Sequence, residues 1–267
     1  MILKYTLSGF IYIFPDDDFH ATVDAMLATN YEGDFCLAEG FAPDFIAGLM
    51  EAGFLVMSMN LENEGTPHYI MLPKLHLERS ALFFENLHIK KSIKRLLSPS
   101  RGYELRADAE FDLIIDRCVE KHGADWLTPP LVESIKKIRA SCLSRNPQLP
   151  VSASPLIASQ LPAPCAYPAS FALYRECPNG TKKLVAGEFG VVCGKVYTSY
   201  SGFYDENNAG SVQLILTTRY LQEHGFAFFD MGMPLDYKTD LGAVDIIPEE
   251  FVRLFREAQA VLDEGNL

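Results

Sequence analysis

The sequence contains little cysteine, little positive charge and no long apolar run. Six cysteines are scattered along its 267 residues, at Cys36, Cys118, Cys142, Cys165, Cys177 and Cys193. They form no Cys-x-x-Cys pair and lack the spacing to histidine that zinc sites use. This pattern predicts reduced thiols in a cytoplasmic protein and no metal site.

Long apolar stretches are missing as well. No uncharged run approaches the ~20 residues that a helix needs to span a bilayer. The apolar run at 11–14 is short, has only Lys4 before it and meets three aspartates at 16–18. We therefore expect neither a membrane span nor a secretory signal peptide.

Positive charge is scarce, because 23 lysines and arginines face 35 aspartates and glutamates, for a formal net charge of -12. This balance argues against unspecific adhesion to nucleic acid, but binding depends on where cations cluster. Residues 88–101 and 136–145 are basic stretches, and each is expected on a helix with its cations in water. Together they predict a phosphate-binding face; two solvated surface helices are the alternative.

Apolar residues make up 48% of the chain, which is enough for one large or two modest domains. The mixture of strand and helix patterns predicts an α/β (α+β) protein. A proline-, serine- and alanine-rich stretch at 146–170 reads as an insertion at a domain boundary. We expect a small N-terminal α/β domain at 1–85, a helical segment at 86–145, this insertion, and a C-terminal domain at 171–267.

The N-terminal part contains clear start and stop signals for helices and strands. The patterns predict a strand at 11–14, a helix at 21–28, a helix from Pro43 to Gly53, and strands at 54–59 and 69–72. Consecutive carboxylates rarely converge on one ion, so the aspartates at 16–18 favour a helix start over a metal site.

Two further helices are predicted before the insertion. The helix at 108–120 should bury Phe111, Ile114, Ile115 and Cys118, which fall on one face. Thr128 and Pro129 open the next helix directly after Trp126, the only tryptophan.

The stretch 184–230 organises the C-terminal part. It predicts an apolar strand, a turn at Cys193-Gly194, a second strand, a polar loop at 205–211, a helix that ends at His224-Gly225, and a short strand that ends at Asp230. Free backbone N–H groups where the loop enters the helix can hold an anion. An ordinary α/β unit without a ligand is the alternative. A short helix at 236–241 and a last helix at 248–262 follow.

Several segments in this order resemble the leucyl/phenylalanyl-tRNA-protein transferases. The matching residues are Leu184, Val185, Gly187, Gly190, Ser201, Phe203, Asn208, Ala209, Asp230, the run 241–243, Ile247 and Pro248. Earlier segments also look like the family: Trp126-Leu127-Thr128-Pro129 is similar to its WITP helix entry, and 87–95 is similar to its LHISRSMKR segment. The resemblance extends from about residue 39 to residue 255, broken by the insertion.

The resemblance implies a GNAT-like C-terminal domain with a mixed, mostly antiparallel sheet flanked by helices. It implies transfer of leucine or phenylalanine from aminoacyl-tRNA to the α-amine of a protein N-terminus, which marks that protein for degradation. Such a reaction uses no cofactor beyond its aminoacyl-tRNA donor. We expect a cytoplasmic protein that has no membrane partner and acts as a monomer.

The sequence departs from the family at its chemistry. The family's pocket glutamate falls on Tyr200, its catalytic glutamine falls on Gly232, and its loop lysine falls on Ser211. Two of the family's methionines fall on Glu188 and Gly202. These departures predict an altered specificity.

The site residues carried over by resemblance have two kinds of role. Asp230, Glu188 and Tyr200 are candidates near the reacting amine; Trp126, Phe203, Ser201, Asn208, Ser211 and Gly232 are candidates for substrate binding. Trp126 either stacks an adenine or plugs the core. Asp230 either holds a water, acts as a base or caps local backbone.

One hypothesis is that Glu188 replaces the family's pocket glutamate, which falls on Tyr200 in the neighbouring strand. A tight turn at Cys193-Gly194 would pair Glu188 with Ser199, which places Glu188 and Tyr200 on opposite faces unless a bulge intervenes. A pocket that contains Glu188 would favour a polar or cationic group over leucine, because a buried carboxylate needs a partner.

Two other classes of function stay open. The protein can be an acyl-CoA-dependent GNAT acyltransferase, although the loop lacks the arginine- and glycine-rich phosphate cradle usual for CoA. It can also be a non-catalytic protein that binds aminoacyl-tRNA or N-terminal peptides, which the missing glutamine and glutamate favour.

Overall fold

The computed structural model describes residues 2–62, 65–145 and 166–260. The N-terminal part contains α1 (Phe19–Ala28), α2 (Pro43–Glu51) and an antiparallel pair of strands, β1 (Leu55–Asn60) and β2 (Tyr69–Lys74). The Asp18 side chain accepts a hydrogen bond of 2.9 Å from the backbone N–H of Ala21 and so caps α1. The interpretation of residues 16–18 as a helix start is confirmed.

The strand predicted at 11–14 is wrong. Tyr12 and Ile11 make isolated bridges to Leu37 and Tyr5, and no continuous ladder forms in this described stretch. Ile11 and Ile13 are buried in the core as loop residues, whereas Phe14 is exposed. The apolar residues of this segment therefore predicted the burial of Ile11 and Ile13 correctly, but they did not predict strand pairing.

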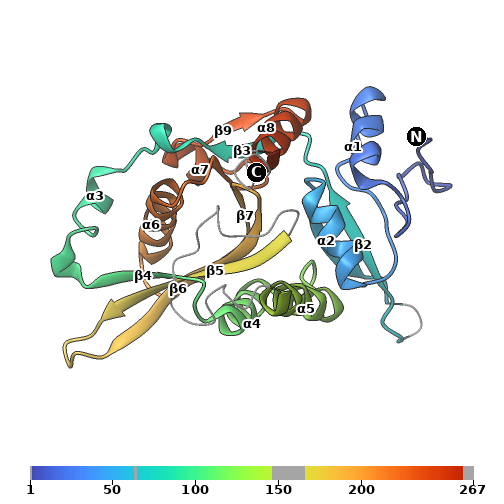
Figure 1. Ribbon diagram of the computed structural model, residues 1–267. Coiled ribbons are helices and arrows are strands. Elements are labelled where there is room, and N and C mark those ends of the chain that lie inside the picture. The colour runs from blue at the N-terminus through green and yellow to red at the C-terminus, as the bar shows by residue number, and fades with distance from the viewer. Residues whose placement is uncertain (1, 63–64, 146–165, 261–267) are drawn as a thin grey trace.

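A seven-stranded sheet forms the larger part of the molecule (Figure 1). Its spatial order is β4 (Tyr103–Ala107), β5 (Ala166–Glu176), β6 (Lys182–Cys193), β7 (Val196–Tyr204), β8 (Phe228–Asp230), β3 (Arg79–Leu82) and β9 (Val244–Ile246). Every neighbouring pair is antiparallel except β7 and β8, which are parallel. This is the mixed, mostly antiparallel sheet predicted for a GNAT-like domain, so the predicted fold class is confirmed.

Helices cover both faces of this sheet. α4 (Phe111–His122) and α5 (Pro129–Arg145) pack on one face, and α6 (Ala209–Glu223) packs on the other (Figure 1). α4 buries the four residues predicted for its apolar face, and α5 begins at the predicted proline. α7 (Asp236–Leu241) and α8 (Pro248–Ala260) complete the chain described.

The sheet takes two of its strands from segments before residue 171. β3 lies in the predicted N-terminal domain and β4 in the predicted helical segment. β5 begins at Ala166, so the last five residues assigned to the insertion are strand; 146–165 lie outside the described residues. The predicted domain boundaries therefore do not follow the sheet.

The long helix predicted at 88–101 is wrong. Only α3 (Lys91–Lys94) forms there, between the 3₁₀ turns η1 (Phe84–Asn86) and η2 (Pro99–Arg101). Proline disfavours helical backbone at the residue before it, and Ser98 is extended. The basic residues of this segment therefore lie on a mostly irregular loop.

The core runs continuously from α1 and α2 through the sheet to α8. The five cysteines in the described part are free thiols, and no described helix is long and apolar enough to cross a bilayer. No group of three His, Cys, Asp or Glu residues that could hold a metal ion occurs within the described residues.

Candidate active site

Asp230 ends β8 inside a buried ion pair. Arg79 on β3 donates to both carboxylate oxygens, from Nε at 2.9 and 3.1 Å and from Nη2 at 2.6 Å. Arg79 and Asp230 are 1% and 0% exposed. Thr198 Oγ1 donates to the same carboxylate at 2.8 Å and the Gly232 N–H donates at 3.0 Å. The pair ties together β3, β7, β8 and the turn that follows.

The environment of Asp230 keeps its carboxylate ionised. Burial opposes ionisation, but the charge and hydrogen bonds of Arg79, with the donors on Gly232 and Thr198, hold the pKa of Asp230 below its ordinary value. Each oxygen already accepts at least two hydrogen bonds. Asp230 is thus suited to positioning the turn at Gly232 and poorly suited to taking up a proton.

Lys238 on α7 holds the same turn from the other side. Its Nζ donates to the carbonyl oxygens of Met231 and Met233 at 2.5 and 2.6 Å. Ser80 N–H donates to the Gly232 carbonyl at 2.7 Å. Burial lowers the pKa of Lys238 to about 8, against the attraction of nearby carboxylates such as Asp230. The backbone at 231–233 is therefore fixed by three elements.

Replacing Lys238 by methionine is expected to loosen this turn. Methionine keeps the apolar stem and removes the donor, so two carbonyls lose their partner at a cost of about 1–3 kcal/mol each when they stay buried. Urea unfolding should show the loss of stability. Lys137→Met, on the exposed surface of α5, is the matched control, and equal effects of the two variants would contradict the assignment.

Gly232 occupies the position of the family's glutamine in a left-handed conformation, with φ +74°. A residue with a side chain costs about 1–2 kcal/mol there. Gly232→Gln is therefore expected to destabilise the fold by about that amount without raising turnover. Gly180→Gln carries the same backbone penalty in an exposed hairpin turn, φ +79°, and isolates it. A Gly232→Gln protein with higher turnover would contradict this view.

The strands β6 and β7 differ from the predicted register. Cys193 pairs with Val196, so the turn lies at Gly194-Lys195, and Glu188 pairs with Gly202 instead of Ser199. A bulge at Tyr200 shifts the ladder between Phe189 and Gly190. Glu188 and Tyr200 nevertheless face opposite sides of the sheet, as their contacts below establish.

Tyr200, Ser201 and Phe203 lie on the face covered by α4 and β1. The Tyr200 hydroxyl accepts a 3.1 Å hydrogen bond from the Val56 N–H, and burial raises its pKa. The Ser201 hydroxyl lies beside the Cys118 thiol of α4. Phe203 is buried under the guanidinium of Arg117, 4.5 Å from its ring centre. These three side chains have protein partners within the described fold.

Trp126 lies on the same side of the sheet, at the entry to α5. Its carbonyl accepts hydrogen bonds from Ser58 N and Oγ at 3.0 and 3.2 Å, which joins it to β1. The side chain is half-buried and packs against the core. The side chain is therefore neither fully exposed nor fully buried, and both interpretations of Trp126 fit this position.

Glu188 faces α6, on the opposite side. Ser199 Oγ donates to its Oε2 at 3.0 Å, and Gln213 and Thr217 of α6 lie against it. Burial raises the pKa of Glu188 to about 7, although these polar neighbours and the charge of Lys238 counteract part of that effect. The structure therefore separates the candidate residues into two groups, one on each face of the sheet.

The loop at 205–211 leads into the N-terminus of α6. Asn208 has left-handed backbone and its side chain does not cap the helix; Asn208 and Ser211 are both exposed. The acids beside them are paired, Asp205 with Arg117 at 2.7 Å and Glu206 with Arg175 at 2.5 Å. The helix start is accessible to an anion, but its immediate surroundings are close to neutral.

The two basic stretches differ in how many cations are free. All four cations of α5 are paired: Lys136 with Asp112 and Asp116, Lys137 with Glu133, Arg139 with Asp108, and Arg145 with Asp44. Between η1 and β4, Lys91, Lys94, Arg95 and Arg101 are exposed and have no ion pair with any described residue. η1 and β4 both contact α6. The segment that carries the free cations thus starts and ends at elements that contact α6.

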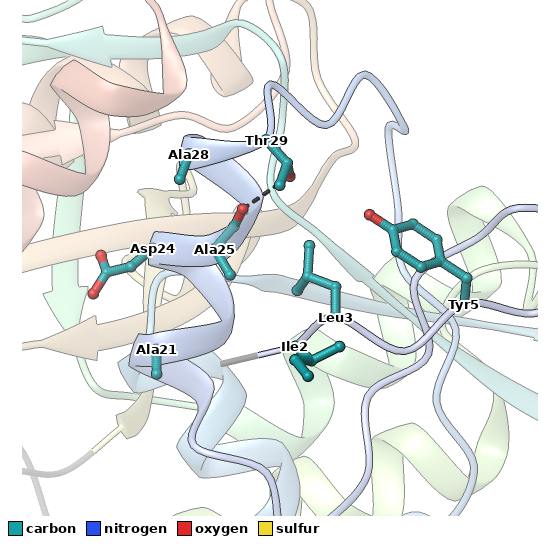
Figure 2. A pocket seen from close by; sticks show the side chains of 8 residues that line it. All are labelled: Ile2, Leu3, Tyr5, Ala21, Asp24, Ala25, Ala28 and Thr29. Atoms are coloured by element: carbon teal, nitrogen blue, oxygen red, sulfur yellow. Dashed lines mark hydrogen bonds between the residues drawn. The ribbon is translucent and has the colours of Figure 1, made fainter.

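A pocket of about 620 Å³ lies away from both groups of candidate residues. It lies between the N-terminal segment and α1 (Figure 2) and is lined by Ile2, Leu3, Tyr5, Ala21, Asp24, Ala25, Ala28 and Thr29. Its one carboxylate, on Asp24, is paired with Arg256. A void of about 10 Å³ lies between Arg79, Thr198 and Tyr200 and has room for one water at most. The first of these pockets carries no reactive group.

Sequence reasoning missed Arg79, Lys238 and Gln213. Nothing local distinguishes Arg79 in its short strand, and its role depends on Asp230, 151 residues later. Lys238 and Gln213 stand on helices that were predicted, so their burial could have been found from the helical pattern had a charged or polar residue on the buried face been sought.

Comparisons with known proteins agree with the family resemblance seen in the sequence. A family model described as leucyl/phenylalanyl-tRNA protein transferase matches residues 167–256. A leucyl/phenylalanyl-tRNA–protein transferase from Maridesulfovibrio salexigens is 25% identical over 67% of this chain and 65% of its own length. One from Pseudomonas putida is 26% identical over 62% and 61%. The matches thus span less than two thirds of these two relatives.

Among solved structures, that of FemX aligns with 94% of this chain and 85% of its own at 11% identity and a TM-score of 0.44.

Proposed function

Because the chain belongs to the leucyl/phenylalanyl-tRNA–protein transferase family, we propose that it transfers an amino acid from aminoacyl-tRNA to the α-amine of a protein N-terminus. The family match over 167–256 carries this proposal, since that region contains β5 to β8, α6 and the turn after Asp230. The proposed place of action is the cytoplasm, and the proposed role is to mark the acceptor for degradation.

The reaction needs few groups. The amine nitrogen forms a bond to the ester carbonyl carbon, the bond from that carbon to the ribose oxygen breaks, and a proton passes from the amine to that oxygen. A protein assists by orienting the two reactants and by stabilising charge on the carbonyl oxygen. Aminoacyl-tRNA is an activated ester, so orientation alone supplies a large part of the acceleration.

The residues at the end of β8 are suited to such orientation. Arg79 and Lys238 fix the backbone around Gly232, as Asp230 does from within the turn. We assign Asp230 a positioning role because its oxygens are fully occupied by donors. Trp126, on the same side of the sheet as Asp230, is the proposed contact for the terminal base of the tRNA, worth about 1–3 kcal/mol if it stacks.

The phosphates of the tRNA are assigned to the free cations between η1 and β4. Lys94→Glu with Arg95→Glu is expected to weaken tRNA binding and to reduce the slope of log K against log salt by about 2. Lys136→Glu with Lys137→Glu changes the charge equally on α5, where both cations are already paired, and should have the smaller effect. Equal effects measured by filter binding would contradict this assignment.

Transfer is tested with labelled total aminoacyl-tRNA and a peptide that has a free N-terminus. Label on this peptide, and none on the same peptide with an acetylated N-terminus, is the expected result. Acetyl-CoA in place of aminoacyl-tRNA should give no product; an acetylated product would instead indicate the acyl-CoA-dependent activity.

A non-catalytic binding protein is the second candidate. It is favoured by one observation, the left-handed glycine at the position of the family's glutamine. Salt-dependent binding of charged tRNA without label on any peptide would support it over the transferase.

A further inference from the structure

Buried polar side chains form a cluster between the sheet and α6. This α6-facing cluster consists of Glu188 on β6, Tyr197 and Ser199 on β7, and Gln213 and Thr217 on α6. Glu188 is 2% exposed, Gln213 is 3% exposed, and Tyr197 and Thr217 are 0% exposed. A layer of this depth is normally apolar, so its polar content calls for an explanation.

Two polar atoms in the cluster have no hydrogen-bond partner among the described residues, Glu188 Oε1 and Tyr197 Oη. Glu188 Oε2 accepts from Ser199, and Gln213 Nε2 donates to Thr217 Oγ1 at 2.9 Å. A buried polar group without a partner costs about 1–3 kcal/mol, and more when it is charged. Ser199, Gln213 and Thr217 stabilise the carboxylate in part, but Oε1 still has no partner within hydrogen-bond distance, so internal hydrogen bonding accounts for only part of the buried carboxylate.

Glu188 also lacks a cation of its own. The charge of Lys238 acts on Glu188, but Lys238 makes no ion pair with Glu188 within the described chain, and its Nζ donates to two backbone carbonyls. Tyr237 is the other titratable group that Glu188 influences from α7. The ion pair of Arg79 and Asp230 belongs to the opposite face. The charge of an ionised Glu188 is thus compensated only in part, and a positive group that reaches it from outside would complete the compensation.

We propose that the α6-facing cluster binds the positively charged side chain of the transferred amino acid, with Glu188 as the residue that determines donor specificity. This inference rests on the proposed transferase function. An ammonium group has three donors, and the cluster offers acceptors on Glu188, Ser199, Gln213 and Thr217. An aliphatic side chain would leave Glu188 Oε1 without a partner, so leucine is a poor donor.

The proposal is tested first by binding, without catalysis. Lysinamide and norleucinamide have the same backbone and chain length and differ in the terminal amine. Calorimetry should show that wild-type protein binds lysinamide at least about tenfold more tightly, the lower end for a hydrogen bond to a charged group. Glu188→Gln should abolish this preference, and Glu188→Leu should reverse it. Binding of lysinamide should strengthen from pH 6 to pH 8, as Glu188 ionises.

Controls distinguish a specific loss of the preference for lysinamide from misfolding and from recognition of the α-amine, which both amides share. Glu223→Gln makes the same change on the exposed end of α6 and should keep the wild-type preference. Thermal unfolding of each variant reports on the fold. Equal binding of the two amides, or a preference that survives Glu188→Gln, would overturn the proposal.

Transfer assays then separate this inference from the proposed function. If lysinamide binds through Glu188 while no aminoacyl-tRNA supports transfer, the specificity of the cluster stands and the transferase function fails. If leucine is transferred in preference to lysine and Glu188→Gln changes nothing, the function stands and the inference fails. Preferential transfer of lysine that is lost in Glu188→Gln supports both.

Discussion

Replacing Arg79 by methionine is expected to lower the free energy of unfolding by about 3–5 kcal/mol, because it leaves the Asp230 carboxylate buried without its partner. The guanidinium also donates to the Gly53 carbonyl at 2.9 Å and lies 4.0 Å from the ring centre of Phe251. One side chain therefore joins the sheet to α8 and to the segment after α2. Urea unfolding followed by circular dichroism measures the change.

Two companion variants make the Arg79 result interpretable. Arg253→Met on the exposed face of α8, where the arginine pairs with Glu250 and Glu257, should leave stability nearly unchanged. Arg79→Met combined with Asp230→Asn should recover part of the loss, since no buried charge then remains. Equal stability of the Arg79 and Arg253 variants would refute the assigned role.

Replacing Glu188 by glutamine is expected to remove a pH dependence of stability. The pKa of Glu188 is raised by burial from 4.5 in the unfolded chain to about 7 in the fold. Between these values the folded protein binds a proton that the unfolded chain has released, so the free energy of unfolding falls as pH rises. Above pH 7 both states are ionised and the penalty stays constant, at about 3 kcal/mol.

The measurement is a difference between two proteins, so that other carboxylates cancel. Wild-type and Glu188→Gln proteins should be equally stable near pH 4.5, and the variant should be increasingly the more stable of the two up to pH 7–8. The exposed control Glu223→Gln should follow the wild type throughout. A difference that stays constant with pH would show that Glu188 is ionised in the fold at every pH tested.

Together these two predictions describe the two faces of the sheet. On the face toward α8, a charge is buried with its partner, and removing the partner is costly. On the face toward α6, a carboxylate is buried without one, and neutralising it should stabilise the fold. A stabilising substitution that removes binding is the usual trade-off at a functional site.

The sequence predicted the elements with strong local signals. Helices with a proline entry or a glycine exit were confirmed, as at Pro43, Pro129 and Gly225. The strands β5 to β8 were also predicted, since their apolar and β-branched runs are long or follow a turn. In these places, local propensity and tertiary structure agree.

Elements that depend on distant partners were missed. β3 has four residues and starts at a buried arginine, and only its neighbours β8 and β9 make it a strand. The bulge at Tyr200 could not be predicted because the hairpin turn was placed one residue early. Opposite faces for Glu188 and Tyr200 were expected only without a bulge; the bulge is present, and the two side chains still lie on opposite faces because Tyr200 stays on the side of β1.

The most direct test of the account is the mass of an acceptor peptide after incubation with the protein and total aminoacyl-tRNA. The predicted product carries one additional residue at its N-terminal amine, and fragmentation identifies that residue as a cationic one. An unchanged peptide, in the presence of charged tRNA that binds the protein, would contradict the central claim that this fold still catalyses aminoacyl transfer.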